Sequence, residues 1–489
     1  MGDTKHGIVA AGHPVTAEAG ARVLREGGNA VDGAVAAMLA SFVAEPLLTG
    51  LGAGGYMMVA GGGLEPALLD FFIEAPPRSA GGHGAELEAV DVSFGDAVQV
   101  FYIGPASCGV YGIPAGVCEA MATWGSKDLS ELAASAASLA REGVALNAGQ
   151  AYVAEILGDL LRSTPECAAL WAPGGRILRE GETMRNEELA EALLLLGREG
   201  AAPFYSGRVA AAVCDWVAAR GGALTADALA AYRAIPREPI RVAYRGRSVM
   251  TNPPPAAGGL LLAYALALLD REPAPVSLAA LVSAMESAQA ERTPEFLHGL
   301  GEDGYAGRFL GSRLGATTHI SVLDASGRAC SVTATNGEGS AVVVPGTGIH
   351  LNNVMGEEDL SPLGFHSHPA GSRMPSMMAP TVVLRDGAVE LVLGSAGSNR
   401  IRSALLQTIV AAVDHGMDAR DAVRAPRVHY EPGVVYHEPG IDARELGDRE
   451  VVAFHDLNLF FGGVQAVLQR AGRMTGAGDP RRGGVAVIA

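Results

Sequence analysis

Two threonines, Thr317 and Thr335, flank a segment whose pattern predicts a β-hairpin. Positions 318, 320 and 322 alternate with 317, 319 and 321, a turn is expected at 324–327, and a second strand is expected at 329–335. If residues 324 and 327 close a two-residue turn, paired positions sum to about 651. Thr317 then lies opposite residue 334 and next to Thr335, and a shift of one residue brings the two hydroxyl groups within hydrogen-bonding reach.

A threonine hydroxyl is a good nucleophile only when a nearby base takes its proton. Cleavage of the bond between Ala316 and Thr317 would create such a base, because the new α-amino group belongs to the same residue as the hydroxyl. Threonine is also a good strand former, so the spacing alone favours a purely structural hairpin.

The elements that position this hairpin begin as helices separated by glycines. Thr16 is the expected N-cap of a helix that runs to Glu26, and Asn29 is the expected cap of a second helix over 30–44. The glycine cluster at 50–55 predicts a tight turn into a strand at 56–60. It lacks the Lys-Ser/Thr pair and the preceding strand of a phosphate loop. Further helices are expected after Asn186, over 208–220, from Thr225 to 232, and after the rigid segment 252–259 as far as 269.

Beyond about residue 315 the pattern changes to strands. After the hairpin, strands are expected at 341–344, 381–384 and 389–393, followed by a helix over about 401–415. Helices first and strands second, around one sheet system, predict a layered α/β domain whose catalytic strands come from the C-terminal third.

The composition limits the partners. The chain has 489 residues, with 36 Lys+Arg against 53 Asp+Glu and a formal charge of −17. Nucleic acids and anionic membranes call for basic patches, so neither is expected as a partner. The apolar runs at 33–44 and 258–269 are shorter than the roughly 18 residues of a spanning helix, and no secretory signal is recognisable. The cysteines at 108, 118, 167, 214 and 330 form no C-x-x-C pair, and we expect a cytoplasmic protein with reduced thiols.

Eleven short motifs follow one another along nearly the whole chain, at 13–14, 27–32, 51–57, 112–116, 230–232, 253–259, 315–322, 343–349, 352–353, 394–397 with 400–401, and 479–481. In this order they resemble the γ-glutamyltransferase (γ-glutamyltranspeptidase) family of N-terminal-nucleophile hydrolases. The resemblance implies an α/β fold of four αββα layers, with two stacked, mostly antiparallel sheets between helices.

The resemblance also implies an inactive precursor that cuts itself between Ala316 and Thr317. Residues 1–316 would form a helix-rich large subunit and residues 317–489 a small subunit, both within one domain. The Thr317 hydroxyl would attack an amide, and water or an amine would resolve the acyl-enzyme. Thr335 would orient that hydroxyl, and the backbone N–H groups of Gly397 and Ser398 would form the oxyanion hole. The family has two glycines there, and we expect Ser398 to require an ordinary backbone conformation.

The residues expected to bind substrate depart from the family pattern. Members that act on γ-glutamyl compounds usually hold the glutamyl α-carboxylate with an arginine, whose place is taken here by Phe72. Arg78 lies too far along the chain to replace it by simple register. The family's serine pair reads Ser376-Met377, so one hydroxyl is lost. Because Arg–carboxylate pairs are strong anchors, these changes predict that a glutamyl group binds more weakly, by about 2–5 kcal/mol if no other cation serves.

Two further positions are candidates for substrate contact. Glu357 corresponds to the family's acid after Asn-Asn and would neutralise a substrate amine, although an ordinary acidic turn explains it equally well. Asn336 matches the family's polar contact after the second threonine if a gap of one residue is allowed. His366 and His368 have a spacing that can bind metal, but without a third ligand we expect no metal site, and the mechanism needs no cofactor.

Three functions are consistent with these residues. The first is an autoprocessed enzyme that transfers a γ-glutamyl or similar acyl group from a small amide to water or an amine. The second is a specialised non-glutamyl acylase or C–C bond hydrolase of natural-product biosynthesis, which Phe72 and Met377 favour. The third is an uncleaved, inactive homologue with a binding role. The expected partners are a small-molecule amide and the two subunits of one precursor, and a further homo-oligomer is left open.

Overall fold

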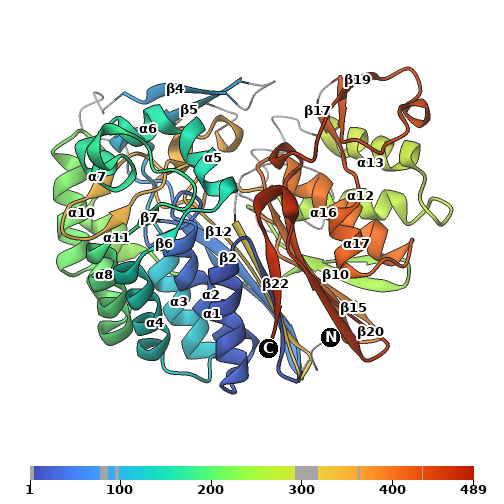
Figure 1. Ribbon diagram of the computed structural model, residues 1–489, viewed down its shortest axis with the longest axis horizontal. Coiled ribbons are helices and arrows are strands. Elements are labelled where there is room, and N and C mark those ends of the chain that lie inside the picture. Colours follow the sequence, from blue (N-terminus) through green and yellow to red (C-terminus); the bar gives the residue numbers. More distant parts are fainter. Residues whose placement is uncertain (1–4, 78–85, 94–97, 292–317, 362–363, 432) are drawn as a thin grey trace.

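The computed structural model describes residues 5–77, 86–93, 98–291, 318–361, 364–431 and 433–489. Within these ranges, two antiparallel sheets stack face to face, and helices cover the outer face of each sheet (Figure 1). This is the four-layer αββα architecture that the resemblance implied, so the predicted fold class is confirmed.

The first sheet has seven strands in the order β22-β1-β11-β12-β2-β3-β8, and all neighbouring strands are antiparallel. The strands are β1 (Gly7–Ala11), β2 (Gly54–Gly61), β3 (Leu64–Phe71), β8 (Ile235–Arg237), β11 (Thr318–Asp324), β12 (Arg328–Thr335) and β22 (Val485–Ile488).

The second sheet has six strands in the order β21-β20-β16-β15-β10-β9, again antiparallel throughout. They are β9 (Ile240–Tyr244), β10 (Arg247–Thr251), β15 (Thr381–Arg385), β16 (Ala388–Ala396), β20 (Gly463–Arg470) and β21 (Arg473–Ala477). Smaller sheets pair β4 (Glu88–Ser93) with β5 (Val98–Ile103), β6 (Val144–Ala145) with β7 (Thr183–Met184), β13 (Val343–Val344) with β14 (Ile349–His350), and β17 (Val428–Glu431) with β18 (Val434–His437) and β19 (Glu450–Ala453).

Both large sheets contain strands from each side of residue 316. In the first sheet, β1 lies between β11 and β22, and in the second sheet β10 pairs with β15. The sequence pattern missed β1, β3, β8, β9 and β10, so the expected division into helices first and strands second is only partly right. Strands of the two segments therefore pair with one another within both large sheets.

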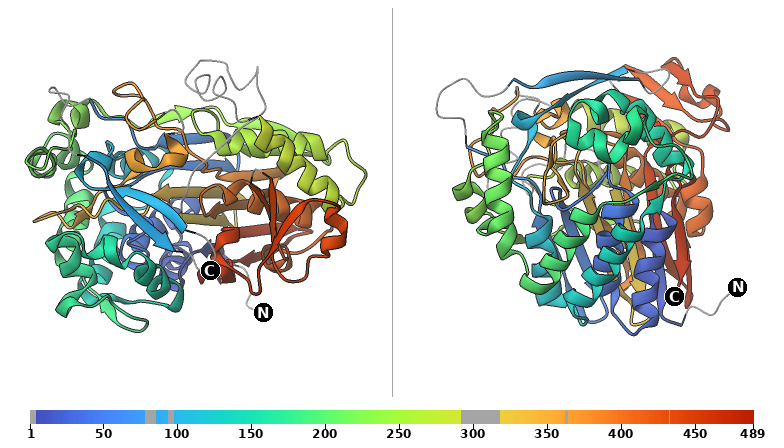
Figure 2. Two further views of the ribbon diagram at one scale, coloured as in Figure 1. Left: turned by 90° about the horizontal axis from the view of Figure 1, so that it is seen from above. Right: turned by 60° about the vertical axis from the view of Figure 1, so that its left-hand side comes forward.

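Helices from the first 231 residues gather on the first sheet's side, in front of the strands in the right-hand view of Figure 2. They are α1 (Pro14–Arg25), α2 (Ala30–Ala44), α3 (Ile113–Trp124), α4 (Leu129–Glu142), α5 (Ala148–Ile156), α6 (Gly158–Arg162), α7 (Pro165–Trp171), α8 (Glu187–Glu199), α9 (Ala202–Tyr205), α10 (Arg208–Ala218) and α11 (Ala226–Ala231). The second sheet is covered by α12 (Ala257–Leu269), α13 (Leu278–Ala290), α16 (Arg400–Val413) and α17 (Ala419–Arg424).

The start of helix α2 is determined by a local capping interaction. The Asn29 side chain accepts from the backbone N–H groups of Val31 and Asp32, and the Asp32 carboxylate accepts from the N–H of Asn29, which forms the reciprocal capping box. All 15 residues of α2 are buried, because the helix packs between the first sheet and its neighbouring helices. The predicted bounds and cap are confirmed.

The predicted cap of α1 is wrong. The helix begins at Pro14, and its N-cap is His13, whose Nδ1 accepts from the Val15 N–H at 3.1 Å. Proline suits the first helical position because its missing N–H would have no partner there. Thr16 lies inside the first turn, and its hydroxyl donates instead to Glu45 at 2.8 Å.

The hairpin of β11 and β12 is present with a register shifted by one residue. Thr318 pairs with Ala334 and Leu323 pairs with Ala329, so paired positions sum to 652. The turn is longer than two residues because Asp324 closes it with its side chain, whose Oδ1 accepts from the N–H groups of Ser326 and Arg328.

The two faces of β11 meet different layers. The Thr318 hydroxyl donates to Glu45 at the end of α2. On the opposite face, the Ser321 hydroxyl donates to the carbonyl of Gln465 in β20, across the sheet interface. The predicted alternation is therefore real, but both faces are buried.

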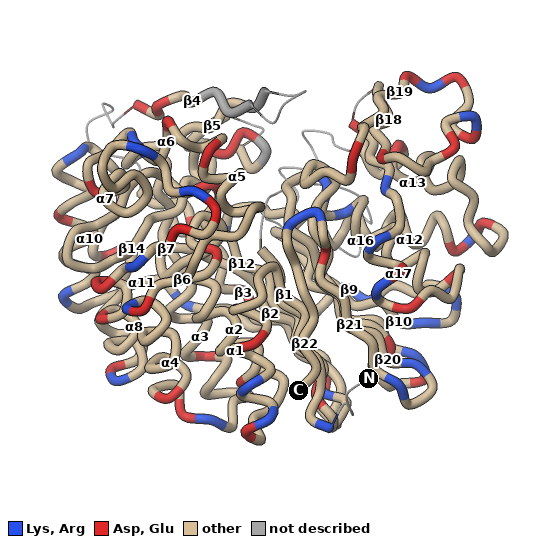
Figure 3. The backbone as a smooth tube through the Cα atoms, in the orientation of Figure 1, with Lys and Arg blue, Asp and Glu red and all other residues tan. Residues whose placement is uncertain are grey.

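The other predicted elements agree in type and differ at their ends. The strand expected at 341–344 is reduced to β13, whereas the predicted helix over about 401–415 is α16. Charged residues concentrate on the outer helices and loops (Figure 3). None of the helices in the described ranges has the length and apolar character needed to cross a membrane.

Candidate active site

Three of the predicted catalytic residues line one pocket, although they lie far apart in the sequence. Thr335 is the last residue of β12, and Gly397 and Ser398 directly follow β16. The cavity volume is about 90 Å³, several times the roughly 10–15 Å³ that one water molecule needs. The fold thus brings the ends of two strands, one from each sheet, to a common site.

The pocket wall is mainly apolar. Its apolar side chains are Leu47, Leu48, Phe101, Val153, Ile156, Leu157, Leu459 and Phe460. The remaining described wall consists of Thr335, Gly337, Glu338, Gly397, Ser398, Arg400 and Arg482. An apolar wall with a few polar groups at one place is typical of a small-molecule site.

Thr335 is held by a short turn that follows its strand. Its side chain is buried, and its Oγ1 accepts a hydrogen bond from the Gly337 N–H at 2.8 Å. Among the described residues no acceptor takes the Thr335 hydroxyl hydrogen. The hydroxyl is therefore held by one accepted hydrogen bond, and its own hydrogen can still be donated.

The Gly397-Ser398 pair forms a sharp turn between β16 and α16. Gly397 has φ of 119° and Ser398 has φ of 53°. The carbonyls of both residues accept from the first turn of the helix, at Arg400 and Ile401. The expectation that Ser398 adopts an ordinary conformation is wrong, because the chain passes from strand to helix within three residues and needs positive φ at both positions.

Gly397 has no room for a side chain. A Cβ atom there would lie 2.7 Å from the Cα of Gly462. The close approach of these two backbones therefore requires glycine at position 397.

A buried carboxyl that the sequence analysis missed lies behind the first residue of β11. Glu45 follows α2 and accepts from the hydroxyls of Thr16 and Thr318, at 2.8 and 3.1 Å. Burial raises the pKa of Glu45, and these hydrogen bonds oppose the rise. Glu45 also lines a second pocket, and the two pockets share five residues: Leu47, Leu48, Val153, Leu459 and Arg482.

His319 plays a structural part. Its Nδ1 and Nε2 contact the hydroxyls of Thr333 and Ser321 at 2.8 and 2.9 Å, and burial lowers its pKa to about 3. Its ring occupies the space above Gly394, where a Cβ atom would lie 2.2 Å from it. The histidine fills the gap between the two sheets as a neutral side chain.

Two predicted substrate residues lie directly behind the pocket wall. The Asn336 N–H donates to the carbonyl of Leu48 at 2.9 Å, and its side chain is fully buried. A Cβ atom on Gly337 would lie 2.7 Å from Glu357 Oε1, which places this carboxyl next to the wall. Neither side chain is among the described residues that line the pocket.

Three other predicted residues lie away from this wall. Phe72 stacks on Tyr56 with a centroid distance of 5.5 Å. The Ser376 hydroxyl accepts from the Met378 N–H at 3.0 Å. Met377 packs against the start of α12, where a Cβ atom on Gly258 would be 1.9 Å from the Met377 carbonyl oxygen. None of the three is among the described residues that line the pocket.

Some predicted positions fall outside the described residues. Ala316, Thr317 and Arg78 are among them. His368 Nε2 contacts the carbonyl of Leu360 at 3.2 Å, and His366 has φ of 56°. No group of three metal-binding side chains occurs in the parts of the chain that the structure describes.

The five cysteines are unpaired. Burial raises the pKa of Cys108 and Cys167 to about 12 and that of Cys118 to about 11. Thiols with such pKa values are poor nucleophiles at neutral pH.

The chain matches known proteins over nearly its whole length. The family model described as gamma-glutamyltranspeptidase matches residues 16–299 and 301–489. The acylase ACY 1 proenzyme of Pseudomonas sp. (strain SE83) is 33% identical over 89% of this chain and 84% of the relative. The glutathione hydrolase proenzyme of Escherichia coli (strain K12) is 29% identical over 98% of this chain and 90% of the relative. The crystal structure of cephalosporin acylase from Bacillus halodurans superimposes with a TM-score of 0.84 and 25% identity, over 99% of this chain and 96% of that one.

Proposed function

Because the chain belongs to the gamma-glutamyltranspeptidase family, we propose that it cleaves itself before Thr317 and then acts on a small amide through an acyl-Thr317 intermediate. The observation that carries this proposal is the meeting of Thr335, Gly397 and Ser398 at one pocket next to the start of β11. The names of two similar proteins include the word proenzyme, which agrees with a processed precursor.

The hairpin register supports the pairing of the two threonines. Paired positions in β11 and β12 sum to 652, which is also the sum of 317 and 335. In the processed enzyme, this register continued by one residue sets Thr317 opposite Thr335. The Thr335 hydroxyl, held by the Gly337 N–H, then donates to the Thr317 hydroxyl oxygen and orients it.

The proposed reaction has two steps. The α-amino group of Thr317 takes the proton of its own hydroxyl, and the oxygen attacks the amide carbonyl carbon. The N–H groups of Gly397 and Ser398 bind the oxyanion, and the amine leaves with a proton from the α-ammonium group. Water or a second amine then attacks the ester and releases the acyl group.

Most of the pocket wall is apolar, which favours an apolar acyl chain. Its apolar side chains bury a hydrocarbon chain favourably, at roughly 25 cal/mol per Å². Phe72 stands where the family usually has its carboxylate-binding arginine. We therefore place this chain with the acylases of the family, and γ-glutamyl hydrolysis is the second candidate because glutathione hydrolases are similar over most of the chain.

A denaturing gel tests the cleavage. Fragments of 316 and 173 of the 489 residues, from a chain of 50.0 kDa, correspond to about 32 and about 18 kDa. We expect these two bands for the wild type and a single inactive band for Thr317→Ala. A cleaved and active Thr317→Ala protein would disprove the assignment of the nucleophile, and an uncleaved, inactive wild type would favour a binding role.

Mass spectrometry of the trapped acyl-enzyme tests the chemistry and the specificity together. The wild type is incubated with hexanoyl-anilide or with γ-glutamyl-anilide and quenched with acid. We expect a hexanoyl adduct on the peptide that begins with Thr317, and faster release of aniline from hexanoyl-anilide. Faster turnover of the γ-glutamyl compound would favour γ-glutamyl hydrolysis as the function of this protein.

A further inference from the structure

Arg482 is a cation in the pocket wall that forms no ion pair within 4.0 Å with any described carboxylate. Its guanidinium donates to the carbonyl of Leu459 at 3.3 Å, and its Nε is buried without a hydrogen-bond partner. Among the described residues no carboxylate oxygen lies within 4.0 Å of it. Burial lowers the pKa of Arg482 to about 10, although the more distant charges of Asp479 and Glu338 oppose the fall. The side chain therefore remains charged at neutral pH.

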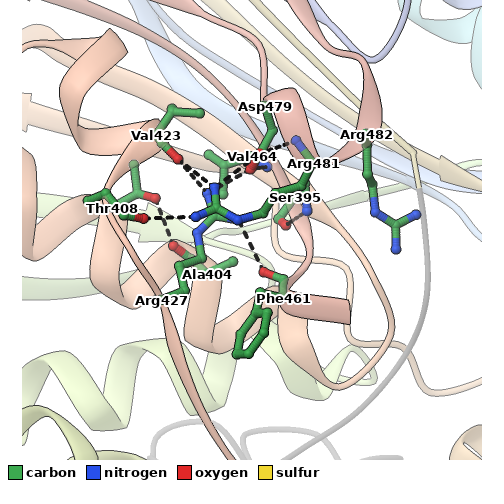
Figure 4. A network of polar contacts seen from close by, with 12 residues as sticks. Ser395, Ala404, Thr408, Val423, Arg427, Phe461, Val464, Asp479, Arg481 and Arg482 are labelled. Atoms are coloured by element: carbon green, nitrogen blue, oxygen red, sulfur yellow. Dashed lines mark hydrogen bonds and ion pairs between the residues drawn. The ribbon is translucent and has the colours of Figure 1, made fainter. Parts of the chain in front are cut away.

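A rigid network fixes the backbone from which Arg482 projects (Figure 4). Asp479 caps the 3₁₀ turn η7 (Pro480–Arg482) by accepting from the Arg481 N–H, and its other oxygen accepts from the Val464 N–H. Arg427 and Arg481 pair with Asp479 at 2.7 and 3.2 Å. Figure 4 shows the Arg482 side chain leaving this network in another direction.

Two glycines make room for the Arg482 side chain. A Cβ atom on Gly463 would lie 2.4 Å from Arg482 Cδ, and one on Gly397 would lie 3.2 Å from Arg482 Nη2. The stem therefore passes over one glycine, and the guanidinium ends beside Gly397. The unpaired charge is thus placed next to the proposed oxyanion hole.

The other charged residues of the pocket differ from Arg482. Arg400 lies 3.9 Å from a carboxylate oxygen of Glu431 and stacks over the Phe460 ring at 4.2 Å. Glu338 also belongs to the wall, but no ion pair within 4.0 Å joins it to Arg482. A buried guanidinium without a carboxylate partner is costly, and such charges are typical of positions where a ligand supplies the counter-charge.

We propose that Arg482 binds the carboxylate of a monocarboxylic acid whose apolar chain lies against the pocket wall. We take this acid to be the product that is released when the acyl-enzyme is hydrolysed. Arg482 lies beside Gly397, and in the proposed function the N–H group of Gly397 binds the oxygen of the reacting carbonyl group. The planar guanidinium offers two parallel N–H donors to both carboxylate oxygens. This inference rests on the proposed function for the source of the acid, whereas the anion site itself rests on the geometry of Arg482.

Calorimetric titration of the wild type with sodium hexanoate and with neutral hexanamide tests the anion site. We expect hexanoate to bind at least tenfold more tightly than hexanamide. In Arg482→Met, hexanoate should lose at least tenfold in affinity while hexanamide is unaffected. The matched control is Arg444→Met, which removes an exposed arginine and should change neither affinity.

Equal affinities for hexanoate and hexanamide in the wild type would overturn the proposal, and so would equal hexanoate affinity in the wild type and Arg482→Met. If Arg482→Met unfolds, Arg482→Gln takes its place with the same expected result. The titration needs neither cleavage nor turnover. An uncleaved chain that binds hexanoate through Arg482 would therefore refute the proposed function and support the anion site.

A kinetic comparison identifies the source of the carboxylate. Hexanoyl-anilide has no carboxylate, whereas the monoanilide of adipic acid carries one on its acyl chain. We expect the wild type to show no preference for the adipic compound, and hexanoate to inhibit the wild type at least tenfold more strongly than Arg482→Met. A preference for the adipic compound that disappears in Arg482→Met would overturn the assignment to the product acid.

Discussion

At the scale of single residues, the site depends on backbone conformations that the residue types alone do not reveal. Gly397 and Ser398 both have positive φ, and only the first is a glycine. The left-handed conformation costs a residue with a side chain roughly 1–2 kcal/mol. The backbone of Ser398 is therefore strained, and this strained conformation sets the position of its N–H group.

Replacement of Ser398 separates the N–H group from the side chain. Ser398→Gly should retain amide turnover within about twofold and change the free energy of unfolding by less than about 1 kcal/mol, because glycine adopts this φ freely. Ser398→Val should lower that free energy by about 1–3 kcal/mol and reduce turnover, because a β-branched side chain does not fit the left-handed region. Urea unfolding and aniline release measure both effects. A valine variant as stable and active as the wild type would contradict the assigned conformation.

The Thr335 hydroxyl is expected to matter for chemistry more than for packing. Thr335→Val keeps the shape and removes the hydroxyl that accepts from the Gly337 N–H. We expect the kcat of aniline release to fall at least tenfold, with a loss of about 1–3 kcal/mol in the free energy of unfolding because a buried N–H loses its partner. Thr335→Ser restores the hydroxyl and should recover most of the activity. Equal kcat in the valine and serine variants would show that the hydroxyl does not orient the nucleophile.

At the scale of elements, a short turn is held by buried charges. Arg427, Arg481, Asp479 and Glu438 are all buried, and Arg481 Nε donates to Glu438 at 2.6 Å. These pairs orient η7, so the geometry of the turn determines where Arg482 points. Buried ion pairs add little net stability, but breaking one leaves an uncompensated charge.

Asp479→Asn should therefore destabilise the protein strongly. The change leaves two buried guanidinium groups with one carboxylate fewer, and we expect the free energy of unfolding to fall by about 3–5 kcal/mol in urea titrations. The matched control is Asp442→Asn, which removes an exposed partner of Arg444 and should cost at most about 1 kcal/mol. Similar losses in the two variants would mean that the network around Asp479 is not the anchor of the turn.

The sequence predicted those elements whose signals are local. The caps at Asn29, Asn186 and Thr225 and the hairpin turn at Asp324 follow from side-chain contacts within a few residues, and each is present. Thr16 was misassigned because Pro14 starts the helix earlier, with His13 as its cap. Strands such as β1 were missed because five buried residues carry no alternation, and their pairing is decided by partners more than 300 residues away.

In the candidate site, too, only the residues marked by local sequence could be predicted. Thr335, Gly397 and Ser398 could be predicted because short motifs mark them, and the structure brings all three to one pocket. The apolar wall could not, because its residues come from separate segments such as Leu48, Phe101 and Leu157 that only the tertiary fold assembles. Arg482 follows the motif at 479–481 directly, but only the three-dimensional structure shows that it forms no ion pair with a described carboxylate.

At the scale of the whole molecule, the two segments on either side of residue 316 share both sheets. β1 contributes to the first sheet between β11 and β22, and β9 and β10 complete the edge of the second. Cleavage at this point would cut the chain but leave its hydrogen-bonded layers continuous. The layers also bury several histidines in places that water does not reach.

These buried histidines predict that stability decreases in acid. Burial lowers the pKa of His13, His350 and His429 to about 4 and that of His319 to about 3, whereas the unfolded chain titrates near 6.5. Between pH 6.5 and about 4, the unfolded state binds up to about four more protons at these positions, so the free energy of unfolding falls as the pH falls. Glu45 offsets part of this difference, because its raised pKa lets the folded chain bind a proton first.

We expect a net uptake of about three protons on unfolding near pH 5.5, which corresponds to a loss of roughly 4 kcal/mol per pH unit. Urea titrations between pH 7 and 5 measure this slope. His319→Gln removes one of the four histidines and should lower the slope by about one proton, whatever it does to the stability at pH 7. His415→Gln, at an exposed position after α16, is the matched control and should leave the slope unchanged. A slope that is the same in the wild type and His319→Gln would mean that His319 binds its proton in the folded protein as readily as in the unfolded chain.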